Sequence, residues 1–240
     1  MDRLFRVEVI SQTPNPQRAI YGGLHQDYSE AFVADGIEYW PHEKECGKIA
    51  ITRLLKGGRG HFGPLEHPQI VLNCGYFPHS TMQQARTHRH ISFDVQSGRY
   101  TSSRIVAAAL HKISVEKAIY LRPEGEYTDR KGKKYLYNFH QRSEDLKYAA
   151  LACDRYRSRL DAGHSEEHAR GLLPFDVRQH WVMSMNMRSL AHFLSVRGKP
   201  DAQLECQQLC ELILPHFKAW APEIYEWFMA NQWKKGRLAP

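Results

Sequence analysis

The chain has 240 residues, and its content of 42% hydrophobic and 25% charged residues is ordinary for a soluble globular protein. It contains no apolar run long enough to span a bilayer, and residues 1–6 lack the apolar core of a signal peptide, so we expect a cytoplasmic protein that binds no membrane. A net charge of +7 with 14 histidines favours an anionic partner, and composition alone does not separate nucleic acid from nucleotide phosphates.

The first half of the chain alternates between strand and helix patterns. Alternating or continuous apolar residues predict strands, and apolar residues at helical spacing predict helices. In chain order we predict a strand at 5–10, helices at 16–28 and 43–55, a strand at 69–76 and a helix at 80–87. The helix at 43–55 is expected to stop at Gly57 and Gly58, and Ser80 is the candidate N-cap of the helix at 80–87.

The second half is expected to be richer in helix. A short apolar segment covers 105–110, and residues 122–134, rich in Pro, Gly and charge, are interpreted as an exposed loop or hairpin insertion. Helices are then predicted at 143–162, 166–172 and 187–196 and from Asp201 to about 214, with a strand at 180–185. No internal repeat or linker appears, so we expect one α/β domain over residues 1–240.

Neither the cysteines nor the basic loop gives a strong signal for a metal or a nucleic acid. The five cysteines are scattered, and no second Cys or His pair stands at zinc spacing from Cys206 and Cys210, so we expect reduced, structural thiols and no metal site. The basic cluster at 130–134 is expected to be a solvated loop tip, with contact to nucleic acid as the alternative.

The segment 87–100 (Thr-His-Arg-His-Ile-Ser-Phe-Asp-Val-Gln-Ser-Gly-Arg-Tyr) carries the densest set of candidate ligand-binding groups. Forked arginine donors and backbone N–H groups suit a nucleotide phosphate, and Arg89, Gly98 and Arg99 offer both. An exposed basic loop is the alternative. We interpret Ser97 as a binding group rather than a nucleophile, because no partner at a fixed sequence distance activates it.

Two further segments concentrate polar groups. Residues 61–67 (His-Phe-Gly-Pro-Leu-Glu-His) contain two His and one Glu without an i, i+4 pairing, so a turn held by side-chain hydrogen bonds is favoured over a metal site. In 186–197, Arg188 and His192 share one face of a predicted helix whose other face is an apolar stripe. That polar face would contact a ligand or solvent.

These segments, in this order, resemble the hallmark segments of the flavin-dependent thymidylate synthases. His-Arg, seven residues and Ser-Gly-Arg-Tyr in the central stretch are similar to that family's signature, and 61–67 is similar to its His-x-Ser/Thr-Pro-x-Glu-His segment. Residues 169–174 (Ala-Arg-Gly-Leu-Leu-Pro) resemble its Ala-Arg-x-x-Leu-Pro. Residues 186–205 resemble Asn-x-Arg-Ser-Leu-x-x-Phe-Leu-x-x-Arg followed by Ala-Gln-x-Glu, and the opening at 9–16 also looks like that of the family.

The resemblance implies a mixed α/β fold, with a mixed β-sheet flanked by helices, that assembles as a homotetramer. It implies reductive methylation of dUMP to dTMP, with methylenetetrahydrofolate as one-carbon donor, NADPH as reductant and FAD as cofactor, and with no cysteine nucleophile. Two alternatives stay open. One is a flavoprotein that binds a uridine nucleotide without methyl transfer, and the other is a basic nucleic-acid-binding protein.

The same resemblance implies a role for particular residues. Arg197 would contact the uracil edge and promote ionisation at N3, and Arg170 would reach dUMP from an adjacent subunit. The implied dUMP-binding residues are Gln83, Gln84, Arg86, Thr87, Val95, Gln96, Ser97, Gly98, Arg99, Arg170 and Arg197. The implied FAD-binding residues are His61, Gly63, Glu66, Thr87, His88, Arg89, Val95, Asn186, Arg188 and His192. The chain departs from the family pattern at Thr87, where the family has Arg, at Gly63, where it has a hydroxyl residue, and at Asp201, where it often has His.

Overall fold

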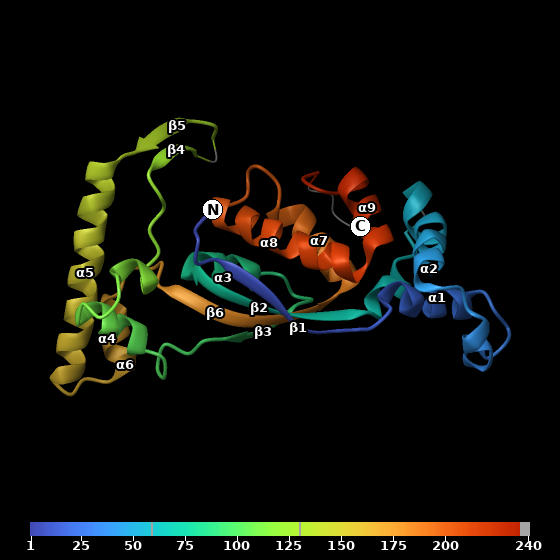
Figure 1. The fold of residues 1–240 in the computed structure, drawn as a ribbon, viewed down its shortest axis with the longest axis horizontal. Coiled ribbons are helices and arrows are strands. Elements are labelled where there is room, and N and C mark those ends of the chain that lie inside the picture. Colours follow the sequence, from blue (N-terminus) through green and yellow to red (C-terminus); the bar gives the residue numbers. More distant parts are fainter. Residues whose placement is uncertain (59, 130, 236–240) are drawn as a thin grey trace. The chain divides into compact units, whose positions relative to one another are not determined.

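The computed structural model describes residues 1–58, 60–129 and 131–235 (Figure 1). Arg130, part of the basic cluster at 130–134, lies outside the described residues. One sheet has the strand order β1-β2-β6-β3. Its strands are β1 (Arg6–Gln12), β2 (Gln69–Pro78), β3 (Ser92–Val95) and β6 (Arg178–Asn186). A separate antiparallel hairpin pairs β4 (Gly125–Thr128) with β5 (Lys134–Tyr137), with Gly125 opposite Tyr137.

Helices make up most of the remaining regular structure. They are α1 (Pro16–Asp27), α2 (Glu43–Ala50), α3 (His79–Ala85), α4 (Ser103–Ala109), α5 (Phe139–Asp161), α6 (Glu166–Ala169), α7 (Met187–Arg197), α8 (Leu204–Trp220) and α9 (Pro222–Asn231). A π-helical turn, η2 (Ile51–Leu55), continues α2, and 3-10 turns include η4 (Gly63–Glu66) and η6 (Arg170–Leu172). The predicted mixture of helix and sheet is confirmed.

The described chain divides into two compact units. The first unit comprises Met1–Arg6, Cys74–Thr87 and Asp94–Trp181. The second unit comprises Val7–Asn73, His88–Phe93 and Val182–Pro240. A single domain over 1–240 stays a prediction.

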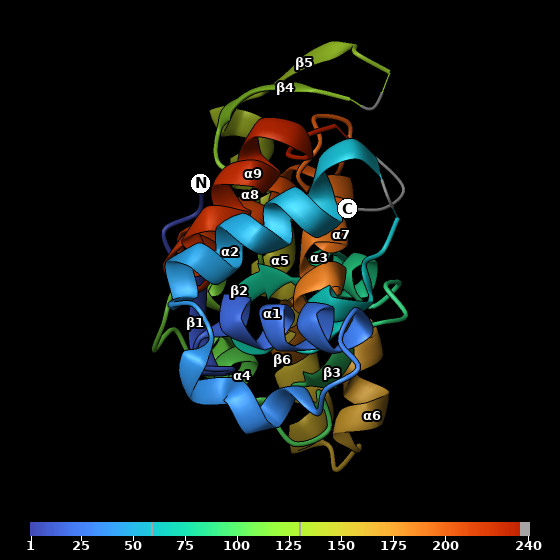
Figure 2. The same ribbon diagram turned by 90° about the vertical axis from the view of Figure 1, so that its right-hand side faces the viewer.

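In the second unit, α1 and α2 lie side by side (Figure 2). The backbone N–H groups of Gln17 and Arg18, at the start of α1, both donate to the carboxylate of Glu43 at 2.8 Å. An acidic group at this position satisfies N–H groups that have no partner within the helix and also favours the positive end of the helix dipole. The Gln17 side chain, which is fully buried, donates to Glu223 at 2.8 Å and accepts from the N–H of Ile224 at 3.2 Å, so it ties α1 to α9.

Gly47→Ala is expected to destabilise the protein by about 1–3 kcal/mol, because a β-carbon at this position overpacks the contact between α1 and α2. It would lie 2.5 Å from Oε1 and 2.6 Å from Cδ of the buried Gln17 amide. The clash outweighs the gain of about 1 kcal/mol that alanine normally brings within a helix. The free energy of unfolding should be compared with that of Gly36→Ala, where a β-carbon has nothing within 4 Å. Equal stability of the two variants would refute this account.

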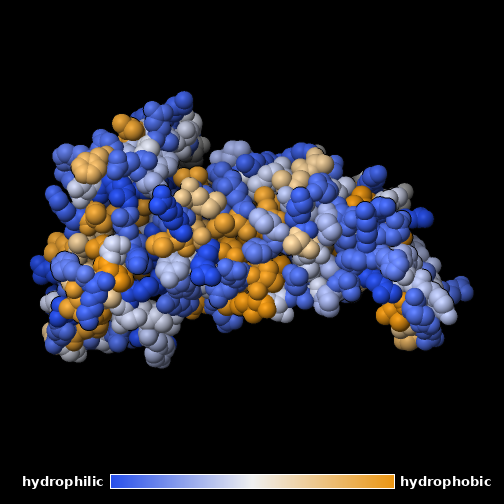
Figure 3. Space-filling model, in the orientation of Figure 1, coloured by the Kyte–Doolittle hydropathy of each residue, from blue (hydrophilic) through white to orange (hydrophobic). Residues whose placement is uncertain are grey.

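The first unit exposes large apolar side chains along β5 and α5. Leu136 is 58% exposed, Phe139 72%, Tyr148 63% and Leu151 54%. Figure 3 shows apolar residues on the surface over α5. Apolar side chains that gather in one exposed patch, unlike single exposed ones, mark a surface for interaction.

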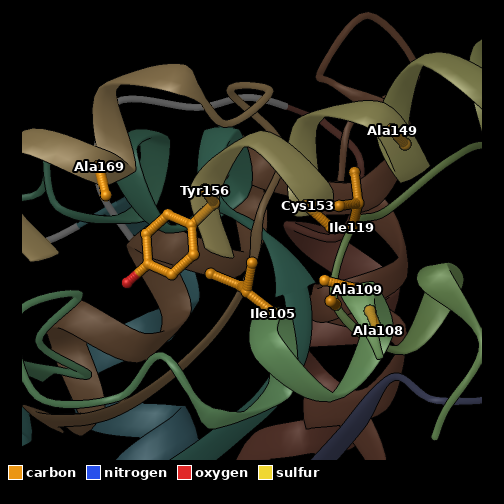
Figure 4. Packing of buried hydrophobic residues seen from close by; sticks show 9 residues of the cluster. Ile105, Ala108, Ala109, Ile119, Ala149, Cys153, Tyr156 and Ala169 are labelled. Atoms are coloured by element: carbon orange, nitrogen blue, oxygen red, sulfur yellow. The ribbon is translucent and has the colours of Figure 1, made fainter. Parts of the chain in front are cut away.

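The core of the first unit lies where α4 and α5 pack together (Figure 4). Ala108 and Ala109 on α4 face Ala149 and Cys153 on α5, and these small side chains allow the two helices to approach closely. Tyr156 of α5, which is fully buried, extends the cluster towards Ile105 and Ala169. This packing positions the start of α4 and the turn after α6.

Three helices begin at a different residue from the predicted one. The helix predicted from Ser143 begins at Phe139, because Asn138 and Gln141 form a reciprocal capping box. Helix α3 begins one residue before Ser80, whose side chain does not cap it. The last predicted helix begins at Leu204 rather than near Asp201 and continues to Trp220, and α9 follows it at Pro222.

Candidate active site

A cavity of about 610 Å³ lies within the first unit. Its walls come from α3, the end of β3 and the loop after it, α4, η6 and β6. Among the described residues, four arginines line it, Arg86, Arg104, Arg170 and Arg178, and no Asp or Glu does so. Polar groups in an otherwise apolar wall of this size are typical of a small-molecule site. The excess of cations means that an anionic ligand fits it best.

Arg178 is the most deeply buried of these arginines, with a side chain 2% exposed. It forms an ion pair with Asp2 at 2.6 Å and donates to the carbonyl oxygens of Tyr76 at 2.7 Å and Glu116 at 2.5 Å. The ring of Tyr120 covers its guanidinium at 5.2 Å. Its charge and donors are therefore engaged within the protein.

Arg104 is only half buried and has a different environment. Its Nη2 donates to Gln96 Oε1 at 2.9 Å and to the carbonyl oxygen of Arg178 at 3.0 Å, and its guanidinium lies over the Tyr76 ring at 5.3 Å. Burial, the largest effect, and the neighbouring charge of Arg178 both lower the pKa of Arg104. Among the described residues, no carboxylate lies within ion-pair distance of Arg86, Arg104 or Arg170.

The loop after β3 is held rigidly at the cavity wall. The backbone N–H of Gln96 donates to the carbonyl of His180 at 2.9 Å, which continues the pairing of β3 with β6 by one residue. The Ser97 carbonyl accepts from the Thr101 hydroxyl at 2.6 Å. The Ser97 hydroxyl accepts from the N–H of Arg99 at 3.3 Å. This hydroxyl belongs to a turn, which favours a binding role over that of a nucleophile.

In the second unit, Arg197 at the end of α7 donates from Nε to His88 Nε2 at 2.9 Å. The His88 ring also meets the rings of His192 at 5.6 Å and Phe193 at 5.0 Å. Burial and the charges of Arg197 and His192 lower the pKa of His88 to about 4. His88 is therefore neutral near pH 7, and its Nε2 can accept the hydrogen bond that orients Arg197.

A second polar group lies where η4 packs against α7, within the same unit. Arg188 forms an ion pair with Glu66 at 2.6 Å and lies over the Phe62 ring at 5.7 Å. The Arg188 side chain keeps 41% of its surface exposed, so a ligand can reach it. The Asn186 side chain caps α7 by accepting from the N–H of Ser189 at 2.8 Å.

The described residues supply neither a membrane-spanning helix nor a metal-binding group. No helix among them is long and apolar enough to cross a bilayer. Within the same residues, no group of three or more His, Cys, Asp or Glu side chains could hold a metal ion. All five cysteines are buried outside any disulfide, and burial raises the pKa of Cys46 and Cys153 to about 11.

Comparison with known proteins identifies the family. The family model described as "Thymidylate synthase complementing protein" matches residues 8–223. The curated flavin-dependent thymidylate synthase of Haloarcula marismortui is 31% identical over 98% of this chain and 99% of its own length. The chain belongs to the flavin-dependent thymidylate synthase family. The prediction of the family is thus confirmed.

Other relatives agree with this assignment. The flavin-dependent thymidylate synthase of Halobacterium salinarum is 29% identical over 98% of this chain and all of its own length. A structure of Thymidylate Synthase X from Helicobacter pylori with FAD and dUMP has a TM-score of 0.69 at 19% identity, over 94% of this chain and 98% of that one. A UMP/dUMP methylase from Streptomyces cacaoi, bound with 5-Br dUMP, has a TM-score of 0.72 at 20% identity, over 95% of this chain and 96% of that one. These two structures establish the likeness of fold.

The structure of this family member brings part of the predicted dUMP set together. The predicted residues that line the cavity are Arg86, Val95, Gln96, Ser97, Gly98 and Arg170. Arg170 lies beside Gly98 of the same chain, since a β-carbon on Gly98 would be 3.8 Å from Arg170 Nη1. Whether Arg170 also serves an adjacent subunit stays a prediction.

Four predicted dUMP residues of the first unit do not line the cavity. Gln83 bonds to His79 at 2.9 Å, and the Thr87 hydroxyl donates to the Gln84 carbonyl at 2.8 Å. Arg99 is paired with Glu167 at 3.0 Å, with half of its side chain exposed.

Most of the predicted FAD residues belong to the second unit of this family member. They are His61, Gly63, Glu66, His88, Arg89, Asn186, Arg188 and His192. Of these, His88 contacts His192, Glu66 contacts Arg188, and His61 bonds to Asp27 at 2.7 Å. Thr87 and Val95 fall in the first unit.

Sequence reasoning missed Arg104, Arg178 and Gln179 as cavity residues. The local signal for Arg104 is its position, immediately before the apolar segment 105–110 and close to the central motif. No local signal marks Arg178, since its partner Asp2 lies 176 residues away.

Stability is expected to fall as the pH is lowered from about 6.5 towards 4, because the pKa of His88 is lowered from 6.5 to about 4 in the folded chain. Within that window the unfolded chain binds a proton at this ring and the folded chain does not, so protons favour unfolding. His180, whose pKa burial and Arg104 also lower to about 4, adds to the effect.

His88→Gln should therefore show a smaller loss of melting temperature between pH 7 and pH 4.5 than the unmodified protein. The control is His140→Gln, because the His140 side chain is 78% exposed. An identical pH dependence for His88→Gln and the unmodified protein would contradict this account.

Proposed function

We propose that the protein converts dUMP to dTMP, with methylenetetrahydrofolate as carbon donor, NADPH as reductant and FAD as cofactor. The cavity, which described arginines line and no described Asp or Glu does, carries the proposal, together with the family to which the chain belongs. In this reading, Arg86 and Arg170 supply positive charge for the nucleotide phosphate, and Gln96, Ser97 and Gly98 supply neutral polar contacts.

Arg197 is the proposed catalytic residue. A guanidinium stays charged at any pH that the protein tolerates, so it can stabilise the negative charge that develops on the uracil ring as C5 becomes nucleophilic. Its hydrogen bond to His88 supports this role, because the neutral imidazole fixes the guanidinium without neutralising it. The orientation of Arg197 is thus set before the nucleotide arrives.

The residues of the second unit fit a flavin dinucleotide. Such a cofactor needs donors for its phosphate and carbonyl oxygens and rings or apolar groups against its own rings. Arg188 keeps accessible surface while Glu66 holds it in place, and His88 and His192 present imidazoles beside Phe193. These residues would hold FAD, which when bound supplies reducing equivalents drawn from NADPH.

The proposal includes assembly as a homotetramer, as the family resemblance implies. The exposed apolar side chains of β5 and α5 support it, because large exposed apolar patches mark interaction surfaces. Mass determination by light scattering at several protein concentrations tests the assembly. A monomer at all concentrations would contradict it.

The test of function is dTMP formation by the purified protein with FAD, dUMP, methylenetetrahydrofolate and NADPH. We expect dTMP from the unmodified protein and a large loss with Arg170→Ala, because Arg170 lines the cavity. Arg155→Ala is the matched control, since Arg155 is an exposed residue of α5 outside the cavity.

Other results of this assay would favour one of the two alternative functions. NADPH consumption without dTMP would indicate a flavoprotein that binds uridine nucleotides without methyl transfer. A colourless protein whose binding to nucleic acid falls steeply with salt would indicate the nucleic-acid-binding alternative. UMP should be assayed beside dUMP, since one structural neighbour is described as a UMP/dUMP methylase.

A further inference from the structure

The side-chain amide of Gln96 has a defined orientation in the cavity wall. Arg104 Nη2 lies 2.9 Å from Gln96 Oε1. A guanidinium has only N–H donors, so the group that faces it must be the amide oxygen and not the amide NH₂. The NH₂ group of Gln96 is therefore the part of the amide left for other partners.

Arg104 can impose this orientation because it is itself held on several sides. The same Nη2 donates to the Arg178 carbonyl at 3.0 Å, and the guanidinium lies over the Tyr76 ring at 5.3 Å. Arg178 is in turn fixed by its ion pair with Asp2. The main chain of Gln96 is fixed separately, through its N–H bond to the His180 carbonyl at 2.9 Å. Both ends of the Gln96 side chain are thus restrained.

The charge of the surrounding cavity wall indicates which kind of ligand atom the Gln96 amide would meet. Gln96 and Arg104 both line the cavity, together with Arg86 and Arg170, and no carboxylate of the residues that the structure describes lines it. A glutamine with a free amide could offer either a donor or an acceptor to a ligand. With its oxygen turned to Arg104, the amide presents its NH₂ group as the side that faces other partners, which matches the positive character of the wall and suits a ligand oxygen.

We infer that Arg104 is a positioning residue for nucleotide binding, which holds Gln96 so that its amide N–H groups donate to an oxygen of the pyrimidine nucleotide. This inference rests on the proposed function, because it takes the nucleotide as the ligand of the cavity. The oxygen belongs either to the phosphate or to the nucleoside, and both offer the same acceptor chemistry.

Gln96→Glu is the decisive variant. Its carboxylate keeps the contact with Arg104 as an ion pair but presents an oxygen instead of N–H groups to the ligand. We expect an unchanged or higher melting temperature and a dissociation constant for dUMP raised by about 10- to 100-fold, measured by calorimetry on the FAD-loaded protein. A purely structural role for the pair predicts unchanged affinity, and that result would overturn the inference.

Variants of Arg104 test the positioning step. Arg104→Met leaves the amide free to rotate and should raise the dissociation constant for dUMP by about 5-fold or more. Arg104→Lys retains a charge and a donor for Gln96 and should restore much of the affinity. If Gln96→Glu weakens binding but Arg104→Met does not, Gln96 contacts the ligand without help from Arg104, and the inference fails.

Gln96→Leu, which removes the donors without adding charge, identifies the acceptor. If binding of both dUMP and deoxyuridine weakens, the oxygen belongs to the nucleoside, and if only dUMP binding weakens, it belongs to the phosphate. Unchanged binding of both ligands would overturn the inference. Failure of the unmodified protein to bind dUMP would instead refute the proposed function itself.

Discussion

Replacing Arg197 by alanine is expected to lower the rate of dTMP formation by about 10²- to 10³-fold, the range found when one stabiliser of a developing negative charge is removed. Arg197 is a cation oriented by His88 at 2.9 Å, so its loss removes the charge that this side chain would place beside the uracil ring. The effect should appear in kcat more than in KM, since the charge develops only as the ring becomes nucleophilic.

The measurement is steady-state dTMP formation, with Arg155→Ala as the control for loss of an exposed arginine. The absorbance of bound FAD and the melting temperature should be recorded for each variant, so that loss of cofactor or of fold is separated from loss of chemistry. His88→Ala should lower kcat by less than Arg197→Ala, because it removes only the group that orients the guanidinium. If Arg197→Ala retains the kcat of the unmodified protein, Arg197 is not the catalytic cation.

The parts of the fold that sequence predicts well are those fixed by neighbours along the chain. Helix α7 was predictable because its apolar stripe and its N-cap, Asn186, lie within a dozen residues. The start of α5 was not, because Asn138 and Ser143 are both plausible caps and only the reciprocal bond between Asn138 and Gln141 decides between them. Helix α9 is absent from the prediction, although Pro222 stands at the first helical residue, a position that proline favours.

The candidate site likewise contains residues that local motifs predict and residues that only distant partners place. Local motifs identify Gln96, Ser97 and Gly98, which follow one another in a loop of the cavity wall. They do not reveal that Arg99, in the same motif, turns to Glu167, which lies 68 residues further along the chain. Nor do they reveal Arg178 or Arg104, whose places depend on partners from distant segments. Long-range pairing of charges has no signature in a single sequence.

Arg178→Met is expected to destabilise the protein by about 3–5 kcal/mol, the usual effect of removing one partner of a buried ion pair. The Arg178 side chain is 2% exposed and that of Asp2 12%. The variant would leave the Asp2 carboxylate and the carbonyls of Tyr76 and Glu116 without the donor that Arg178 gives to each. Each acceptor that stays buried without a partner adds its own desolvation penalty.

The measurement is a double-mutant cycle in chemical denaturation, with Arg178→Met, Asp2→Ala and the double variant, and Arg155→Met as the control. We expect the double variant to be less destabilised than the sum of the single variants, because each single variant already breaks the ion pair and the double variant leaves no unpaired carboxylate at position 2. Asp2 also accepts from the N–H of Leu4 at 2.8 Å. Asp2→Ala therefore lowers the free energy of unfolding for a second reason, and the cycle separates this loss from that of the ion pair. Additive effects, or a loss below about 1 kcal/mol for Arg178→Met, would show that the pair contributes no more than a surface ion pair. The first residues of the chain would then not anchor Arg178 in the cavity wall.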